Sequence, residues 1–151
     1  MGAATKTKEN EEMIFVDSNI WCYYFDKRLP EHEKVRGSMR EIVQSEEIIC
    51  NTIIVMEVAH YLVRNFRETV ARKKIEYFVN LSTMKIEDFN RQMLTATLEQ
   101  LLSYAYPNGL GGRDATIVAT MNSEGVTRII SHDGIFKRLA RKLAYEVIDP
   151  I

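Results

Sequence analysis

Short apolar runs alternate with longer segments of helical periodicity along nearly the whole of this chain. Strands are predicted over residues 13–17, 47–51, 83–88, 127–131 and 145–149, and helices over 18–25, 30–46, 52–66, 69–82, 91–106, 113–125 and 134–143. When strands alternate with helices, the connections cross over the sheet and the strands pair in parallel. The pattern therefore predicts a doubly wound α/β fold, with a central parallel sheet between two layers of helices.

The composition is that of an ordinary globular domain. The chain has 151 residues, of which 46% are hydrophobic and 27% are charged, and it shows neither an internal repeat nor a Pro/Gly-rich linker. We expect a single domain over residues 13–151, preceded by a disordered polar tail over residues 1–12. The net charge of −1 excludes a global basic field, so nucleic acid would have to be bound through local patches.

The positions of the cysteines and the composition of the N-terminal segment indicate the cellular compartment of the protein. Cys22 and Cys50 lie inside apolar runs without metal-type spacing, which is typical of reduced core thiols. The polar opening segment lacks the apolar centre of a signal peptide, and Lys6 departs from the myristoylation pattern. No stretch approaches the length of a membrane span. We therefore expect a cytoplasmic protein.

Carboxylates stand where a sheet of this kind binds its ligands, at the carboxyl ends of strands. Asp17 and Asp133 follow predicted strands, and Asp114 stands at the start of a predicted helix. An aspartate near a helix start is often only a cap that accepts a backbone N–H, and for each of these residues taken singly that interpretation is favoured.

Glu57 is different, because it lies in the middle of a predicted helix, where it has nothing to cap. It either faces water, pairs with Arg64 two turns on, or binds a cation. Mg²⁺ and Mn²⁺ prefer hard oxygen ligands, and several carboxylates converge only if a cation offsets their repulsion. Without the metal, at least one of the carboxyl groups should have a raised pKa. The predicted ligands are Asp17, Glu57, Asp114 and Asp133.

Four stretches carry a family resemblance: "IFVDSNIWCYYFD" (14–26), "TIIVMEVAHYL" (52–62), "GGRDATIVATM" (111–121) and "IISHDGIF" (129–136). In order and spacing they resemble the acidic blocks of the PIN domain family, which includes the VapC-like ribonuclease toxins. The resemblance covers residues 13–149. It implies a PIN-like (5′-nuclease-like) three-layer α/β/α fold and a Mg²⁺- or Mn²⁺-dependent endoribonuclease, with Asn19 and Ser131 orienting the ligands. His132 departs from the family pattern, and Asp133 stands at the family's most variable acid.

The resemblance also suggests a mechanism and partners. A metal-activated water would attack the scissile phosphate, leaving 5′-phosphate and 3′-hydroxyl ends. Arg64, Arg113 and Lys137 are candidates for RNA contacts, whereas His60 is more typical of a packing residue. We expect a homodimer, with the aromatic residues of 21–25 in the core and at the dimer contact. A small antitoxin would insert a segment into the site, placing a basic side chain against the carboxylates.

Other functions remain open at this point. A housekeeping RNA-processing nuclease would use the same residues as a toxin, and a PIN-like module that binds RNA or protein would lack catalysis. A phosphoryl-transfer enzyme with an aspartate nucleophile would want a second aspartate at the position of Asn19. The retention of all four acids favours the nuclease.

Overall fold

The sheet is parallel throughout, as the sequence predicts. The computed structural model describes residues 13–151, so the segment expected to be a disordered tail lies outside the described residues. The strands are β1 (Met13–Val16), β2 (Glu47–Asn51), β3 (Met84–Glu87), β4 (Arg128–Ile130) and β5 (Glu146–Ile148). They form a five-stranded sheet in the order β3-β2-β1-β4-β5, and all neighbouring strands are parallel.

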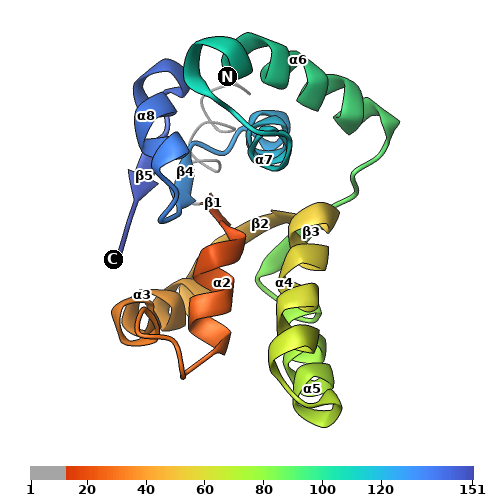
Figure 1. Cartoon of the computed structure of the whole chain (residues 1–151), viewed down its shortest axis with the longest axis vertical. Helices are drawn as coiled ribbons and strands as arrows, with labels where there is room; N and C mark the ends of the chain where they lie inside the picture. Colours follow the sequence, from red (N-terminus) through yellow and green to blue (C-terminus); the bar gives the residue numbers. More distant parts are fainter. Residues whose placement is uncertain (1–12) are drawn as a thin grey trace.

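The helices cover both faces of the sheet (Figure 1). On one side lie α2 (Ser18–Phe25), α3 (His32–Ser45), α4 (Thr52–Asn65) and α5 (Glu68–Val79). On the other lie α6 (Arg91–Asn108), α7 (Gly112–Glu124) and α8 (Gly134–Leu143). The three-layer α/β/α prediction is therefore confirmed, with element ends shifted by a few residues. No helix in the described part of the chain is both long and apolar enough to cross a membrane.

The central strands are buried on both faces, as expected when helices cover a parallel sheet. Apolar residues of β1, β2 and β4 are almost completely inaccessible, namely Ile14, Phe15, Val16, Ile48, Ile49, Ile129 and Ile130. The thiols of Cys22 and Cys50 are both free. Burial raises the pKa of each thiol to about 12, so both stay protonated at neutral pH.

Two aromatic residues of α2, Trp21 and Phe25, belong to the core, and Tyr23 and Tyr24 are partly buried against it. Trp21 is fully buried and its ring centroid lies 4.7 Å from that of Phe78 on α5. Phe25 lies 5.6 Å from the same ring and is only 6% exposed. The expectation that these residues are core is confirmed. Since their surfaces are already covered within one chain, Trp21 and Phe25 are not available as dimer contacts.

Backbone bonds beyond the strand ends bring the polar positions together. The Asp17 N–H donates to the Ile130 carbonyl at 3.0 Å, and the Ser131 N–H donates to the Ile148 carbonyl at 3.0 Å. These bonds extend the ladder one residue past β1 and β4. Side chains that follow the two strands are therefore held at one edge of the sheet, where the helices α2 and α8 begin.

We predict that Asp26→Asn lowers the free energy of unfolding by about 1–3 kcal/mol at pH 7. Asp26 is 2% exposed and accepts hydrogen bonds from the Arg28 guanidinium at 2.9 and 3.0 Å and from the Tyr61 hydroxyl at 2.6 Å. The Arg28 bonds are the main reason that the pKa of Asp26 is lowered to about 2. An amide cannot accept these bonds as strongly, so the junction of α2 with α4 loosens.

The pH dependence checks this prediction by urea unfolding. Because the pKa is depressed in the folded state, the stabilisation is complete above the unfolded pKa near 4 and is lost as the pH falls towards about 2. The gap between wild type and Asp26→Asn should close over that range. Asp88→Asn, at an exposed position, is the matched control. A gap that stays constant down to pH 2 would contradict the assignment.

Candidate functional site

A buried polar chain joins the ends of β1 and β4. Asp17 is completely buried, and its Oδ2 accepts a hydrogen bond from the Ser131 hydroxyl at 2.8 Å. The Ser131 oxygen in turn accepts from the backbone N–H of Asp133 at 3.0 Å. Ser131 therefore ties the two aspartates together and fixes the orientation of Asp17. This is the position in which an orienting residue would act.

Two of the aspartates cap helices as well. Asp17 is the N-cap of α2 and accepts from the Ser18 N–H at 2.7 Å, and Asp133 is the N-cap of α8 and accepts from the Ile135 N–H at 3.2 Å. Asp114 is not a cap, because α7 begins at Gly112 with Gly111 as its N-cap. The capping interpretation is therefore right for Asp17 and Asp133 and wrong for Asp114. Capping does not prevent the carboxylates from sharing a site.

The four carboxylates meet around one cation, the guanidinium of Arg113. Its Nη1 lies 2.8 Å from Asp17 Oδ1 and 3.4 Å from Glu57 Oε2. Its Nη2 lies 2.6 Å from Asp114 Oδ1 and 3.4 Å from Asp133 Oδ2. We call these five residues the Arg113 cluster. Within the described chain Glu57 pairs with Arg113 and makes no ion pair with Arg64, so that sequence-based alternative is wrong.

Burial and the neighbouring negative charges raise the pKa of Asp114. Burial raises the pKa of this carboxyl to about 6, the charges of Asp133, Asp17 and Glu57 add to the effect, and only Arg113 opposes it. The expectation that one carboxyl of the group has a raised pKa is confirmed. For Arg113, burial alone would lower the pKa of the guanidinium, but the charge and hydrogen bond of Asp17 and the charges of Asp114 and Glu57 together outweigh it, and the pKa lies above its ordinary value.

The carboxylate oxygens of the cluster are suitable ligands for a hard divalent cation, but in this structure they are arranged around the guanidinium of Arg113. Carboxylate oxygens are the ligands that Mg²⁺ and Mn²⁺ prefer. Two buried oxygens at this edge, Asn19 Oδ1 and Asp114 Oδ1, lack a hydrogen-bond donor; the close approach of Arg113 to Asp114 is an ion pair without hydrogen-bond geometry. Among residues 13–151, no three acidic, His or Cys side chains are grouped as metal ligands. These oxygens could bind a metal ion only if the guanidinium of Arg113 moved away from them.

The three basic residues predicted to contact RNA lie in different settings. Arg113 points into the carboxylates, and Lys137 is ion-paired with Asp149, whose carboxylate also lies 3.0 Å from His132 Nδ1. Arg64 is exposed in the last turn of α4. RNA contact remains a prediction for all three, and for Arg113 and Lys137 it requires that an existing ion pair be exchanged.

An open hollow of about 500 Å³ adjoins the cluster at Glu57. Its other lining residues are Thr52, Ile53, Met56, His60 and Phe89. His60 is exposed, so its interpretation as a packing residue is wrong. His60 therefore lies beside Glu57 on an open surface, a position that its place in the sequence did not distinguish from packing.

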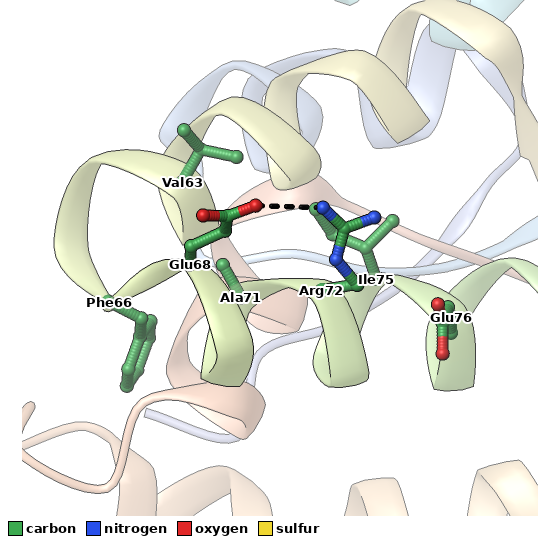
Figure 2. A pocket seen from close by; sticks show the side chains of 7 residues that line it. All are labelled: Val63, Phe66, Glu68, Ala71, Arg72, Ile75 and Glu76. Carbon is green, nitrogen blue, oxygen red and sulfur yellow. Dashed lines mark hydrogen bonds and ion pairs between the residues drawn. The ribbon is translucent and has the colours of Figure 1, made fainter.

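A second hollow of about 390 Å³ lies at the corner between α4 and α5, outside the cluster (Figure 2). Its walls are mainly apolar, with Val63, Phe66, Ala71 and Ile75, and an ion pair of 2.9 Å joins Glu68 to Arg72 at its edge. None of the four predicted acids lines this hollow. It therefore takes no part in a metal site formed by those acids.

Sequence reasoning missed a buried link between α4 and α7. Asn51 ends β2 and caps α4 by accepting from the Ile54 N–H at 2.8 Å, while its amide donates to the Thr120 hydroxyl at 3.0 Å. This bond holds the helix that carries Glu57 against the helix that carries Asp114. The signal in the sequence was a polar residue directly after an apolar strand, the same signal that identified Asp17.

We predict that Asp114→Asn raises the free energy of unfolding of the metal-free protein at pH 7.5, by up to about 2–3 kcal/mol. The pKa of Asp114 is higher in the folded state, about 6, than the value near 4 of an unfolded chain. Its ionisation therefore destabilises the wild type as the pH rises through the interval between these values, and the loss is complete above it.

The measurement is chemical unfolding in chelator-treated buffer between pH 3.5 and 7.5. Wild type should lose stability relative to Asp114→Asn as the pH rises from about 4 to about 6. Asp88→Asn, which is outside the cluster, should follow wild type. If Asp114→Asn is less stable than wild type at pH 7.5, the attraction between Asp114 and Arg113 exceeds the effect of burial and crowding.

Comparisons with known proteins identify the family and the fold of this chain. The PIN domain profile matches residues 14–142, and no curated protein matches the sequence. The fold is similar to that of VapC20 from Mycobacterium tuberculosis, with a TM-score of 0.68 and 17% identity over 83% of this chain and 93% of that one. VapBC2 from Rickettsia felis is similar with a TM-score of 0.67 and 17% identity. FitAcB from Neisseria gonorrhoeae is similar with a TM-score of 0.67 and 18% identity. Each of these two matches covers 91% of this chain and 98% of the other chain. Because the profile spans most of the sequence and the architecture agrees with it, this chain belongs to the PIN domain family and has the fold of the VapC toxins.

Proposed function

We propose that this protein is a Mg²⁺- or Mn²⁺-dependent endoribonuclease that acts as a VapC-like toxin. The observation that carries the proposal is the meeting of Asp17, Glu57, Asp114 and Asp133 at one edge of the sheet, although they lie far apart in sequence. The similar VapC20 is described as a toxin that cleaves the sarcin–ricin loop. That description supports RNA as the substrate class here.

In this proposal the acidic residues bind the metal ion, and two polar residues orient them. Asp17, Glu57 and Asp114 would hold the principal metal ion, and Asp133 would support it or a second ion. When bound, such an ion supplies an activated water and stabilises negative charge on the phosphate. Ser131 holds Asp17 in place through its hydroxyl, and Asn19 offers a buried oxygen that lacks a donor. Positioning contacts of this kind are worth roughly 10- to 100-fold in metal affinity or activity.

The RNA would approach over the hollow beside Glu57. His60 and Phe89 line this hollow, and Arg64 is exposed in the last turn of the same helix as Glu57. Basic and aromatic side chains of this type contact phosphates and bases of single-stranded RNA. The net charge of −1 means that such local contacts, and not a general positive field, would hold the substrate.

An antitoxin is the expected protein partner, and the cytoplasm is the expected location. Among the similar structures, VapBC2 and FitAB are complexes bound to DNA fragments, and the VapBC2 fragment is from its own promoter. We propose that this chain likewise pairs with a small DNA-binding antitoxin. These complexes favour a toxin over the alternative of a housekeeping RNA-processing nuclease.

One observation favours a different function, a PIN-like module without catalysis. Arg113 already neutralises part of the acidic cluster, which is what a permanently metal-free site would need. The two functions differ in a simple property, because the nuclease must bind Mn²⁺ and the module need not.

The proposed homodimer has a candidate surface on α6. Leu94, Leu98, Leu102 and Tyr106 repeat every four residues along this helix, so they share a face, and they are 46%, 48%, 67% and 88% exposed. A row of large apolar side chains left open to water is typical of an interface. We propose that two copies pair through this row, and not through the aromatic residues of α2.

We predict that Leu98→Asp combined with Leu102→Asp converts a dimer to a monomer, since each charge would have to be buried in the interface. Light scattering coupled to gel filtration measures the mass. The matched control, Val63→Asp combined with Tyr77→Asp, changes exposed apolar residues on α4 and α5 and should leave the mass unchanged. A dimer that persists in the α6 variant would place the interface elsewhere.

We predict that Asp17→Asn lowers RNA cleavage in Mg²⁺ or Mn²⁺ by roughly 100-fold or more, because it removes a buried ligand charge. Ser131→Ala should lower it by roughly 10-fold, since the carboxylate remains but loses its positioning bond. Cleavage of a fluorescent single-stranded RNA reports the rate, and Asp88→Asn should match wild type. Undiminished cleavage by Asp17→Asn would exclude the proposed site.

A further inference from the structure

We propose that Arg113 is a built-in counter-ion that occupies the place of the divalent cation, so that metal enters only by displacing its guanidinium. This inference rests on the proposed metal-dependent function and adds to it a control of metal loading. The chain would then carry its own resting state, in which the acidic side chains are gathered and neutralised without metal.

The contacts show that Arg113 bridges the whole cluster and does not pair with a single neighbour. Its two terminal nitrogens reach oxygens of Asp17, Glu57, Asp114 and Asp133 within 2.6 to 3.4 Å, and Nη1 also lies 3.2 Å from the Ser18 hydroxyl. These are the carboxylates proposed as metal ligands. An ion bound by the same oxygens would have to take the space that the guanidinium fills.

Asp17 is held in place, whereas the Arg113 side chain is partly exposed. Asp17 is fully buried and fixed by Ser131 and by its own helix cap. The Arg113 side chain is 30% exposed and leaves α7 in its first turn, directly after Gly111 and Gly112. A Cβ added at either glycine would meet nothing within 4 Å, so the chain around this helix start is uncrowded. The partly exposed Arg113 is thus the side chain that would turn to solvent when a metal ion enters.

The charge balance favours replacement of the Arg113 guanidinium by a divalent ion. Four carboxylates face one guanidinium, and like charges held this closely repel one another. A single positive charge offsets only part of this, so the cluster still attracts a cation of charge two. When the metal leaves, Arg113 returns and spares the fully buried Asp17 the large cost of an uncompensated charge. The guanidinium thus competes with the metal and lowers its apparent affinity.

Calorimetric titration of the chelator-treated full chain with Mn²⁺ tests the inference. Arg113→Gln should bind Mn²⁺ roughly 10-fold more tightly than wild type, because no competing cation has to be displaced. Arg113→Lys keeps the charge but cannot bridge four carboxylates, so its affinity should fall between the two. Arg72→Gln, an exposed arginine on α5 outside the cluster, is the matched control and should bind as wild type does. Equal or weaker binding by Arg113→Gln overturns the displacement.

A second measurement uses the wild-type chain and does not depend on the folding of a variant. Titration with Mg²⁺ should shift the NMR signal of the Arg113 Nε–Hε group towards that of an exposed arginine, the signal being assigned by through-bond correlation to the Arg113 backbone in the wild-type chain. A signal unchanged at saturating Mg²⁺ overturns the inference while leaving the nuclease proposal intact. Absence of Mn²⁺ binding in wild type and in every variant overturns the metal-dependent function itself.

Discussion

The attraction between one guanidinium and four carboxylates is the interaction on which this end of the molecule depends. Asp17 is completely buried, and a buried carboxylate without a partner is strongly destabilising. Arg113 supplies that partner and at the same time reaches Glu57, Asp114 and Asp133. Crowding still shows in the raised pKa of Asp114, because burial and three neighbouring negative charges exceed what one cation offsets. The cluster consequently keeps an excess of negative charge, on which the proposed metal binding depends.

The scaffold around the cluster uses single residues for two purposes. Asp17 and Asp133 each cap a helix and face the shared site, and Ser131 joins them through one hydroxyl. Asn51 does the same on the other side of β1, since it caps α4 and bonds to α7. These fixed groups contrast with the partly exposed side chain of Arg113, which we propose is the part that moves. In a PIN domain nuclease, this contrast would let the ion change while the protein ligands stay in position.

Particular residues show how far the sequence could be interpreted. The apolar runs that end at Asp17 and at Ser131 predicted parallel strands and their polar edge correctly, because a polar residue directly after a short hydrophobic run is typical of a strand end. Glu57 was identified because a mid-helix carboxylate has nothing to cap. His60, which is more typical of a packing residue by its sequence, is exposed, and the pairing of Glu57 with Arg64, one of the alternatives left open, does not form in the part of the chain that the structure describes. Their spacing places them on a helix face, but spacing alone does not say what that face meets.

The sequence by itself determined the parallel α/β fold, the order of its elements and the candidate acids, since these follow from local periodicity and from the geometry of strand ends. Only the tertiary structure decided which cation those acids surround. Arg113 is adjacent to Asp114 in the chain, yet nothing in that adjacency shows that its guanidinium contacts Asp17, 96 residues away. Neighbours in sequence share a backbone, whereas the direction of a long side chain depends on charges that arrive from other elements after folding.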